Sequence, residues 1–258
     1  MNLLNGDSVI FIDNRHGAEL KELKESGEKI EELKAAQEKL KIETLDLARK
    51  LSQERKKAAA LLKEKVEREI ASLGMKKTVF EVRAGSTSAR GEARENLTID
   101  THSLHEKGMD DLEFFISPNP GEELKPLSKI ASGGELSRII LAIKRIIAQE
   151  DEVSTLIFDE VDAGIGGATA EVVGKKLKEI SRRHQVLCIT HLPQIACFAD
   201  THYSITKETR KGRTFTLLKK LESEARIEEL SRMLGGKEIT IKTREHAREM
   251  LSSAQGLP

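Results

Sequence analysis

Two neighbouring carboxylates and one histidine follow apolar segments of the kind that form buried strands. Asp159 and Glu160 end segment 155–160, and His191 ends segment 185–191. In a parallel α/β sheet, ligands bind outside the carboxyl ends of the strands, so these side chains are expected at one edge. Asp159 is suited to hold Mg²⁺ through oxygen, and Glu160 to orient or deprotonate an attacking water. A carboxylate pair can also simply end a buried strand, so this pattern alone leaves both interpretations open.

A glycine turn lies upstream of these segments. Ser132 is suited to N-cap a helix expected from residue 135 to about residue 149. Gly133 and Gly134 would let the backbone approach an anion closely, and the helix start supplies free N–H groups. A tight loop before an amphipathic helix could use the same residues. The Ser-Gly-Gly-Glu run, followed after one helix by a strand ending in Asp-Glu, favours phosphoryl transfer, in which His191 could contact the terminal phosphate.

Four motifs resemble those of ABC-type ATPases. The matching residues are the signature run Ser132-Gly133-Gly134-Glu135, the Walker B strand 156–160, the D-loop 162–166 with Asp162 and Gly164, and the switch histidine His191. Longer runs at 129–138, 158–167 and 190–196 are similar to the RecN family of bacterial DNA-repair ATPases, which are relatives of the SMC proteins. The resemblance covers about residues 45–251 and does not include the first 17.

The resemblance implies an α/β fold, namely the C-terminal lobe of an ABC-type ATPase head, with a parallel sheet flanked by helices and a long coiled-coil helix before it. It also implies ATP and Mg²⁺ as cofactors, with the metal on Asp159. Glu160 and His191 would serve the nucleotide of their own head, whereas the signature residues would cap the nucleotide of the opposite head. ATP-bound heads would therefore form a homodimer, which hydrolysis separates.

The resemblance further implies DNA as a partner, DNA-stimulated ATP hydrolysis, and a role in recombinational repair of double-strand breaks. A recombinase filament is a further candidate partner. Basic pairs at 56–57, 182–183 and 219–220 could touch DNA phosphates, although such pairs are usually solvated surface.

The sequence contains no Gly-x-x-x-x-Gly-Lys-Ser/Thr motif. The run Gly235-Gly236-Lys237 lacks both the upstream glycine and the following hydroxyl residue. Without backbone amides and a lysine around the phosphates, this chain alone is expected to bind nucleotide poorly and to be inactive. We therefore expect a partner, the N-terminal P-loop half of the head, which is either missing from this sequence or supplied by another chain.

A long helical segment precedes the motif region. One row steps by seven through positions 23, 30, 37, 44, 51 and 58, and is apolar except at Gln37 and Thr44; a second row, Leu33, Leu40 and Leu47, lies three residues behind it. These rows indicate a coiled coil whose seam needs a partner helix. We expect three parts: a short segment 1–17 without assignment, a coiled-coil helix 18–74, and the head lobe 75–258. Within the first part, the run 9–12 predicts a short strand. Gly27 could interrupt the helix near its start.

The remaining elements follow from local patterns. Strands are expected at 78–83 and 112–117 with a polar loop at 84–111 between them, a helix at 168–183, an edge hairpin at 203–206 and 214–218, and two final helices at 224–234 and 240–252. Helices that alternate with buried strands predict a parallel sheet covered on both faces.

Composition excludes several classes of protein. The 43 basic and 43 acidic residues balance, so no global basic field points to nucleic acid. No apolar run is long enough to cross a bilayer, and the first residues lack the pattern of a signal peptide. Two cysteines favour a reducing compartment, and we expect a cytoplasmic, nucleoid-associated protein. Two alternatives remain: the head half of another SMC-like or ABC-type ATPase, and a non-catalytic coiled-coil interaction protein.

Overall fold

The chain forms two compact units in the computed structural model, which describes residues 6–86, 97–99, 102–104, 106–148, 152–210, 212–236 and 238–256. One unit comprises residues 1–57 and 84–111, and the other comprises residues 58–83 and 112–258. Among the described residues, no helix is both long enough and apolar enough to span a membrane.

The first helix is longer than the sequence predicted. Helix α1 covers Gly6–Ser72, so the strand expected at 9–12 is wrong. Gly27 does not interrupt the helix, and a methyl group at that position would meet nothing within 4 Å. The cost of glycine in a helix interior, about 1 kcal/mol, is small enough for a long helix to absorb. The boundaries after residues 17 and 74 stay predictions.

Many large apolar side chains of α1 face solvent. Six of them are between 51% and 71% exposed: Leu20, Leu23, Ile30, Leu33, Leu40 and Leu47. A row of exposed aliphatic side chains on one long helix is the pattern that a partner helix would cover. The coiled coil itself stays a prediction.

A small hairpin occupies part of the region where a polar loop was expected. Strands β2 (Leu97–Ile99) and β3 (His102–Leu104) pair antiparallel. Leu104 packs in a small cluster with Leu45 and Ala48 of α1. Ser52 of α1 donates a hydrogen bond to the Asp110 carboxylate at 2.9 Å. Residues 87–96 of the expected loop lie outside the described residues.

Both strands expected on either side of that loop are present and somewhat longer. Strands β1 (Val79–Ser86), β4 (Asp110–Ser117) and β5 (Lys125–Pro126) form a sheet in the order β1-β4-β5, and a short 3-10 helix, Leu127–Lys129, follows. Phe80 is fully buried on β1, with its ring 5.5 Å from that of Phe114.

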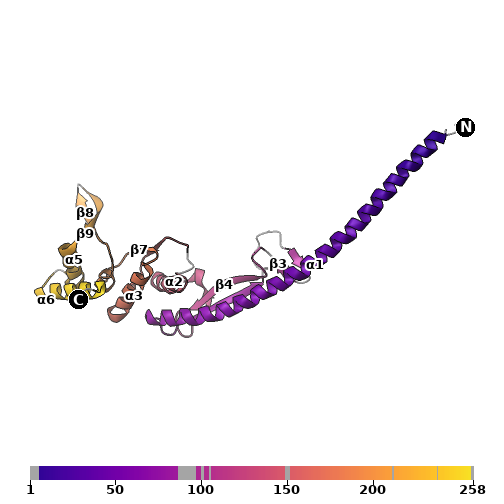
Figure 1. The fold of residues 1–258 in the computed structure, drawn as a ribbon. Helices are drawn as coiled ribbons and strands as arrows, with labels where there is room; N and C mark the ends of the chain where they lie inside the picture. Colours follow the sequence, from indigo (N-terminus) through magenta and orange to yellow (C-terminus); the bar gives the residue numbers. More distant parts are fainter. Residues whose placement is uncertain are drawn as a thin grey trace. The chain divides into compact units, whose positions relative to one another are not determined.

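The motif region folds as a β-α-β unit beside another helix (Figure 1). Strand β6 (Thr155–Phe158) leads through α3 (Gly167–Ile180) to β7 (Gln185–Cys188), and helix α2 (Gly133–Ile147) precedes them. Strands β6 and β7 pair parallel, which confirms the α/β class. The core beneath them joins these elements to the end of α1 and includes Val66, Ile70, Leu73, Ile139, Leu141, Leu156 and Val173.

The parallel sheet is covered on one face, not on both as predicted. Leu156 and Phe158 of β6 point into the core and are buried. Between them Ile157, which is paired with Leu187 of β7, points to the other side and is 70% exposed. Leu187 is 47% exposed, and Ile189 just beyond β7 is 55% exposed. No described segment covers this face.

The C-terminal elements pack around a separate cluster. After α4 (Pro193–Ala196), strands β8 (His202–Arg210) and β9 (Arg213–Leu221) form the predicted hairpin, longer than expected at both ends. Helices α5 (Ser223–Gly235) and α6 (Ile241–Gln255) follow and bury Leu230 and Ala247. The buried Arg226 of α5 donates to the carbonyls of Ala196 and Cys197, at 3.4 and 3.0 Å. This guanidinium therefore holds the end of α4.

Candidate functional site: a glycine turn against a carboxylate pair

Helix α2 begins at the predicted glycine turn. Ser132 adopts extended backbone angles, and its hydroxyl accepts a hydrogen bond from the Glu135 N–H at 3.4 Å. The helix starts at Gly133, two residues earlier than predicted, because this N-cap leaves both glycines in its first turn. The unpaired N–H groups of that turn and the positive end of the helix dipole are suited to an anion.

The two glycines lie directly against the loop that follows β6. A Cβ at Gly133 would stand 2.0 Å from Oε2 of Glu160. A Cβ at Gly134 would stand 2.7 Å from the Cβ of Ala163 and 3.1 Å from the carbonyl oxygen of Glu160. Glycine is therefore required at position 134, where the neighbours are the Cβ of Ala163 and backbone oxygens, whereas at position 133 the Glu160 carboxylate would have to turn aside. The structure thereby brings the glycine turn and the carboxylate pair together.

Both carboxylates are exposed at the end of β6. The Glu160 N–H donates to Oδ1 of Asp159 at 2.8 Å, and the Ser137 hydroxyl of α2 donates to the Asp159 carbonyl at 2.7 Å. Glu160 has a φ of +55°, in the left-handed region that a non-glycine residue adopts at a cost of about 1–3 kcal/mol. Backbone strain of this kind clusters at functional sites, where surrounding contacts hold it in place.

These carboxylates suit Mg²⁺ only in part. The described residues contain no cluster of three or more His, Cys, Asp or Glu side chains that could hold a metal ion. Magnesium, however, is commonly bound by one or two carboxylates together with water and substrate phosphates. Asp159 fits that use because it is exposed in the loop after β6. A complete coordination shell would need ligands from outside this loop.

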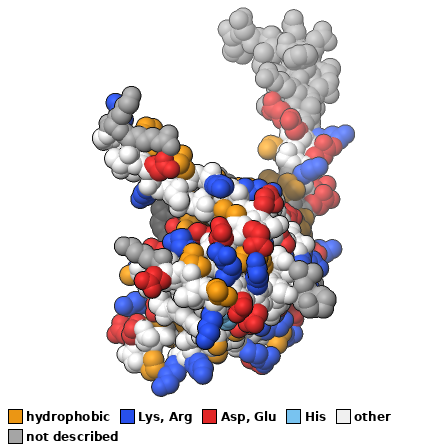
Figure 2. Space-filling model, turned by 90° about the vertical axis from the view of Figure 1, so that its left-hand side faces the viewer, with side chains coloured by type: hydrophobic (Ala, Val, Ile, Leu, Met, Phe, Trp, Pro, Cys, Tyr) orange, Lys and Arg blue, Asp and Glu red, His pale blue; other side chains and the backbone are white. Residues whose placement is uncertain are grey.

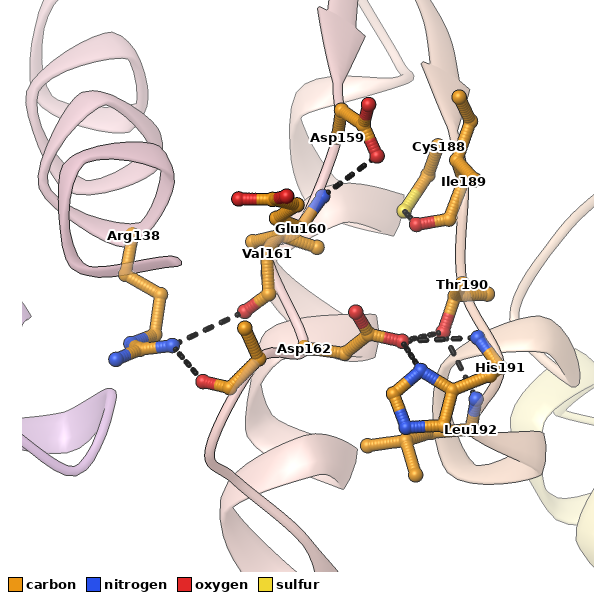
Figure 3. Close-up of polar contacts among 11 residues, drawn as sticks. Arg138, Asp159, Glu160, Val161, Asp162, Cys188, Ile189, Thr190, His191 and Leu192 are labelled. Carbon is orange, nitrogen blue, oxygen red and sulfur yellow. Dashed lines mark hydrogen bonds and ion pairs between the residues drawn. The ribbon is translucent and has the colours of Figure 1, made fainter. Parts of the chain in front are cut away.

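Asp162 connects the loop after β6 to the loop after β7. Its side chain is only 5% exposed, and its Oδ2 accepts from the Thr190 hydroxyl at 2.6 Å and from the His191 N–H at 2.9 Å (Figure 3). The same oxygen lies 2.9 Å from Nδ1 of His191, whose ring is 75% exposed. One buried carboxylate thus holds the predicted switch histidine. Gly164, two residues further on, has a φ of +72°, which glycine adopts without strain.

Sequence reasoning missed Arg138. This arginine of α2 is 6% exposed and donates through one nitrogen to the carbonyls of Val161, at 3.4 Å, and Ala163, at 2.7 Å (Figure 3). Burial lowers the pKa of its guanidinium below the ordinary value, and the charge of Glu135 opposes that shift. The signal was available, because a charged residue interrupts the apolar face of α2 next to Ile139.

The chain is similar to several proteins that share its motifs. A DNA repair protein RecN of Halalkalibacterium halodurans is 38% identical over 251 residues, which are 97% of this chain and 43% of that protein. The DNA repair protein RecN of Bacillus subtilis is 45% identical over 208 residues, 80% of this chain and 36% of that protein. The chain therefore spans less than half the length of these relatives, and it matches their C-terminal part.

A solved structure shares the fold. It is an Smc head domain with a coiled coil and joint, from Pyrococcus yayanosii, and it is 21% identical with a TM-score of 0.50 over 95% of this chain and 39% of that chain. No protein-family model matches the sequence. Because the identity to these relatives extends over most of the chain, and the glycine turn lies against the loop that carries the carboxylate pair, the chain belongs to the RecN family.

Proposed function

We propose that this chain is the C-terminal half of an ATPase head that acts in recombinational repair of DNA double-strand breaks. The observation that carries the proposal is the contact of the glycine turn with Glu160. It joins an anion-binding helix start to a carboxylate suited to activate water. This is the chemistry that phosphoryl transfer to water needs, namely positioning and charge stabilisation.

Each site residue has a proposed role. Asp159 holds Mg²⁺, Glu160 is the general base for the attacking water, and His191 contacts the terminal phosphate of ATP in its own head. The signature residues act on the nucleotide of the opposite head: Ser132, Gly133, Gly134 and Glu135. Asp162 and Gly164 form the D-loop between the two sets. ATP thereby joins two heads into a homodimer, and hydrolysis separates them.

A complementary P-loop half is part of the proposal. The chain lacks the phosphate-binding loop, and it spans 43% and 36% of the two relatives named above. The open face of the parallel sheet supports the proposal, because Ile157, Leu187 and Ile189 are about half exposed or more there. Exposed aliphatic side chains on a core sheet are expected where another segment docks. We therefore propose that the isolated chain hydrolyses ATP poorly.

The remaining parts have roles that follow from the family. Residues 18–74 would form one strand of an antiparallel coiled coil, and residues 75–258 would form the head lobe. DNA is the proposed partner that stimulates hydrolysis at the nucleoid, and a recombinase filament is a second candidate partner. Figure 2 shows Lys and Arg side chains interspersed with Asp and Glu on the face it draws, which favours local phosphate contacts over one large basic surface.

One alternative is a coiled-coil protein without catalysis, since the described site lacks a phosphate cradle. A single experiment separates the two functions. ATP hydrolysis is measured for this chain alone and after mixing with the P-loop half encoded in the same genome, each with and without DNA. We expect turnover only in the mixture, with stimulation by DNA.

Two glutamate variants make the experiment specific. Glu160→Gln should lower the turnover of the mixture at least about 100-fold, because a general base contributes 10²–10⁴-fold, while ATP-bound dimers persist. Glu222→Gln is the matched control, since Glu222 is exposed and pairs only with Lys220 at 3.1 Å in the described structure. Equal turnover of the two variants would exclude the proposed role of Glu160.

A further inference from the structure

We propose that Asp162 is a positioning residue that fixes the tautomer and orientation of the His191 ring. Its carboxylate is 5% exposed, whereas the ring it contacts is 75% exposed. The single oxygen Oδ2 lies within 2.9 Å of three donor positions: the Thr190 hydroxyl, the His191 N–H and the His191 Nδ1. The aspartate therefore holds both the backbone and the ring of His191.

The chemistry of the contact decides the tautomer. An ionised carboxylate only accepts hydrogen bonds, so Nδ1 of His191 must carry the hydrogen in this contact. In a neutral imidazole only one ring nitrogen carries a hydrogen, and the hydrogen bond of one nitrogen sets the state of the other. The neutral ring therefore presents Nε2 without a hydrogen on its exposed side. In the neutral ring Nε2 is then an acceptor, suited to a hydrogen of the attacking water, and it donates to a phosphate oxygen only when the ring is an imidazolium.

The carboxylate is itself held from two sides. Arg138 of α2 donates to the carbonyls of Val161 and Ala163, which flank Asp162 in the chain. On the other side, the Thr190 hydroxyl that donates to Asp162 also accepts from the Leu192 N–H at 3.0 Å. The ring of His191 is thus positioned from helix α2 through the loop after β6 (Figure 3). Packing of this kind around a functional side chain restricts its geometry.

A purely structural role for Asp162 makes a different prediction. If the carboxylate served only to hold the loop, an asparagine could replace it, because an amide oxygen also accepts from a hydroxyl and a backbone N–H. An amide can also turn its NH₂ group toward the ring, and it carries no charge to favour Nδ1–H, so asparagine weakens the preference that the carboxylate imposes. Asp162→Asn therefore separates the two roles.

The first test reads the tautomer directly in the 258-residue chain. Nitrogen-15 NMR of the labelled histidine rings is recorded at pH 9, where a histidine ring is ordinarily neutral, and His191→Gln assigns the signal. We expect the Nδ1–H tautomer at His191 in the parent chain, and loss of that preference in Asp162→Asn. An Nε2–H tautomer in the parent chain would overturn the proposal without any further variant.

Thr190→Val is the matched control. It removes the hydroxyl donor to Asp162 and leaves the carboxylate beside the ring, so His191 should keep the Nδ1–H tautomer. If Thr190→Val changes the tautomer as much as Asp162→Asn does, the loop and not the carboxylate positions the ring, and the proposal fails. The same follows if Asp162→Ala, which removes every side-chain acceptor, leaves the tautomer unchanged.

The consequence for catalysis rests on the proposed function and is measured separately. In the mixture with the P-loop half, Asp162→Asn should lower kcat about tenfold or more, within the range of general acid–base effects, and change KM for ATP by less than about threefold. A parent mixture without turnover would refute the proposed function while leaving the tautomer result intact. A parent mixture that turns over, with Asp162→Asn equally fast, would refute the positioning role.

Discussion

The carboxylate of Glu69, near the end of α1, is contacted by cations from two other helices. It accepts hydrogen bonds from Arg145 of α2 and from Lys176 of α3. The side chains of Glu69 and Lys176 are 17% and 11% exposed, and that of Arg145 is 34% exposed. Arg145 also pairs with Glu179 at 2.7 Å. Glu69 therefore ties α1 to both helices that flank the glycine turn and the loop after β6.

Glu69→Gln should lower the free energy of unfolding by about 2 kcal/mol. The change keeps the size of the side chain but removes the charge opposite Lys176, a poorly solvated cation. Removing one partner of a fully buried ion pair costs about 3–5 kcal/mol. Two effects reduce that figure here. The amide still accepts a neutral hydrogen bond, and water and Glu179 compensate Arg145, which is about one-third exposed.

Glu64→Gln is the matched control for this change. Glu64 lies on the same helix, and its side chain is 67% exposed with Arg68 as its partner at 73% exposure. Exposed pairs spaced four apart contribute little, so this variant should stay within about 0.5 kcal/mol of the parent. Both variants carry the same substitution in the same helix, so a difference between them reflects the burial of the glutamate and the number of cations that contact it.

Amide hydrogen exchange in α2 is the suitable assay. The chain has no tryptophan and one tyrosine, and Tyr203 is half exposed, so fluorescence would report little on this core. Exchange at fully buried Ile139 reports the opening of the cluster itself. Glu69→Gln should speed that exchange about 30-fold, which corresponds to about 2 kcal/mol. Equal protection of Ile139 in Glu69→Gln and Glu64→Gln would refute the reasoning. So would a double variant, Glu69→Gln with Lys176→Met, that recovers none of the protection lost in Glu69→Gln alone.

Three further predictions concern other parts of the molecule. Gly134→Ala should displace the loop after β6 and shift its backbone NMR resonances, because the new methyl group would lie 2.7 Å from the Cβ of Ala163. Gly27→Ala, at a position with open space around it, should instead raise the stability of the helix by about 0.5–1 kcal/mol, measured in thermal melts followed by circular dichroism. Burial, with the charges of nearby aspartates, raises the pKa of the Cys188 thiol to about 12. Alkylation of this thiol by iodoacetamide at pH 8 should therefore be slow until the chain unfolds. The free energy of unfolding should fall as the pH rises above about 9, because there the thiol ionises in the unfolded chain only. Ile157→Asp should weaken docking of the P-loop half in titration calorimetry by at least about tenfold without destabilising this chain, since the side chain is 70% exposed.

The sequence predicted the site best where several residues close together in the chain each require a particular backbone conformation. The N-cap serine and the two glycines each place a local demand on the backbone that the structure meets, and the strand before Asp159 is present, although it ends at Phe158 and not at Glu160. The α/β class followed for the same reason, since strand and helix periods differ along the chain. The roles of these residues in ATP hydrolysis stay predictions.

The sequence could not predict contacts that only tertiary packing creates. Glu69 meets partners 76 and 107 residues away, and nothing in its own heptad marks it as different from the exposed glutamates around it. For Arg138 the sequence signals a charge on the apolar face of α2 but not its partners, which are carbonyl oxygens that every residue has. The strand expected at 9–12 was wrong because four apolar residues fit either period, and the neighbouring helix continues through them.

Under the proposed function, Glu160 and Gly133 serve different nucleotides, yet within one chain they touch. A γ-phosphate presented to the start of α2 by the opposite head would approach the carboxylate that already lies there. Two such anions about 4 Å apart repel each other by about 4 kcal/mol at the effective dielectric of a protein surface. The carboxylate would then have to turn away from the helix start. Filling one signature turn would thus release the base that acts on the other nucleotide, which couples the two sites of the dimer.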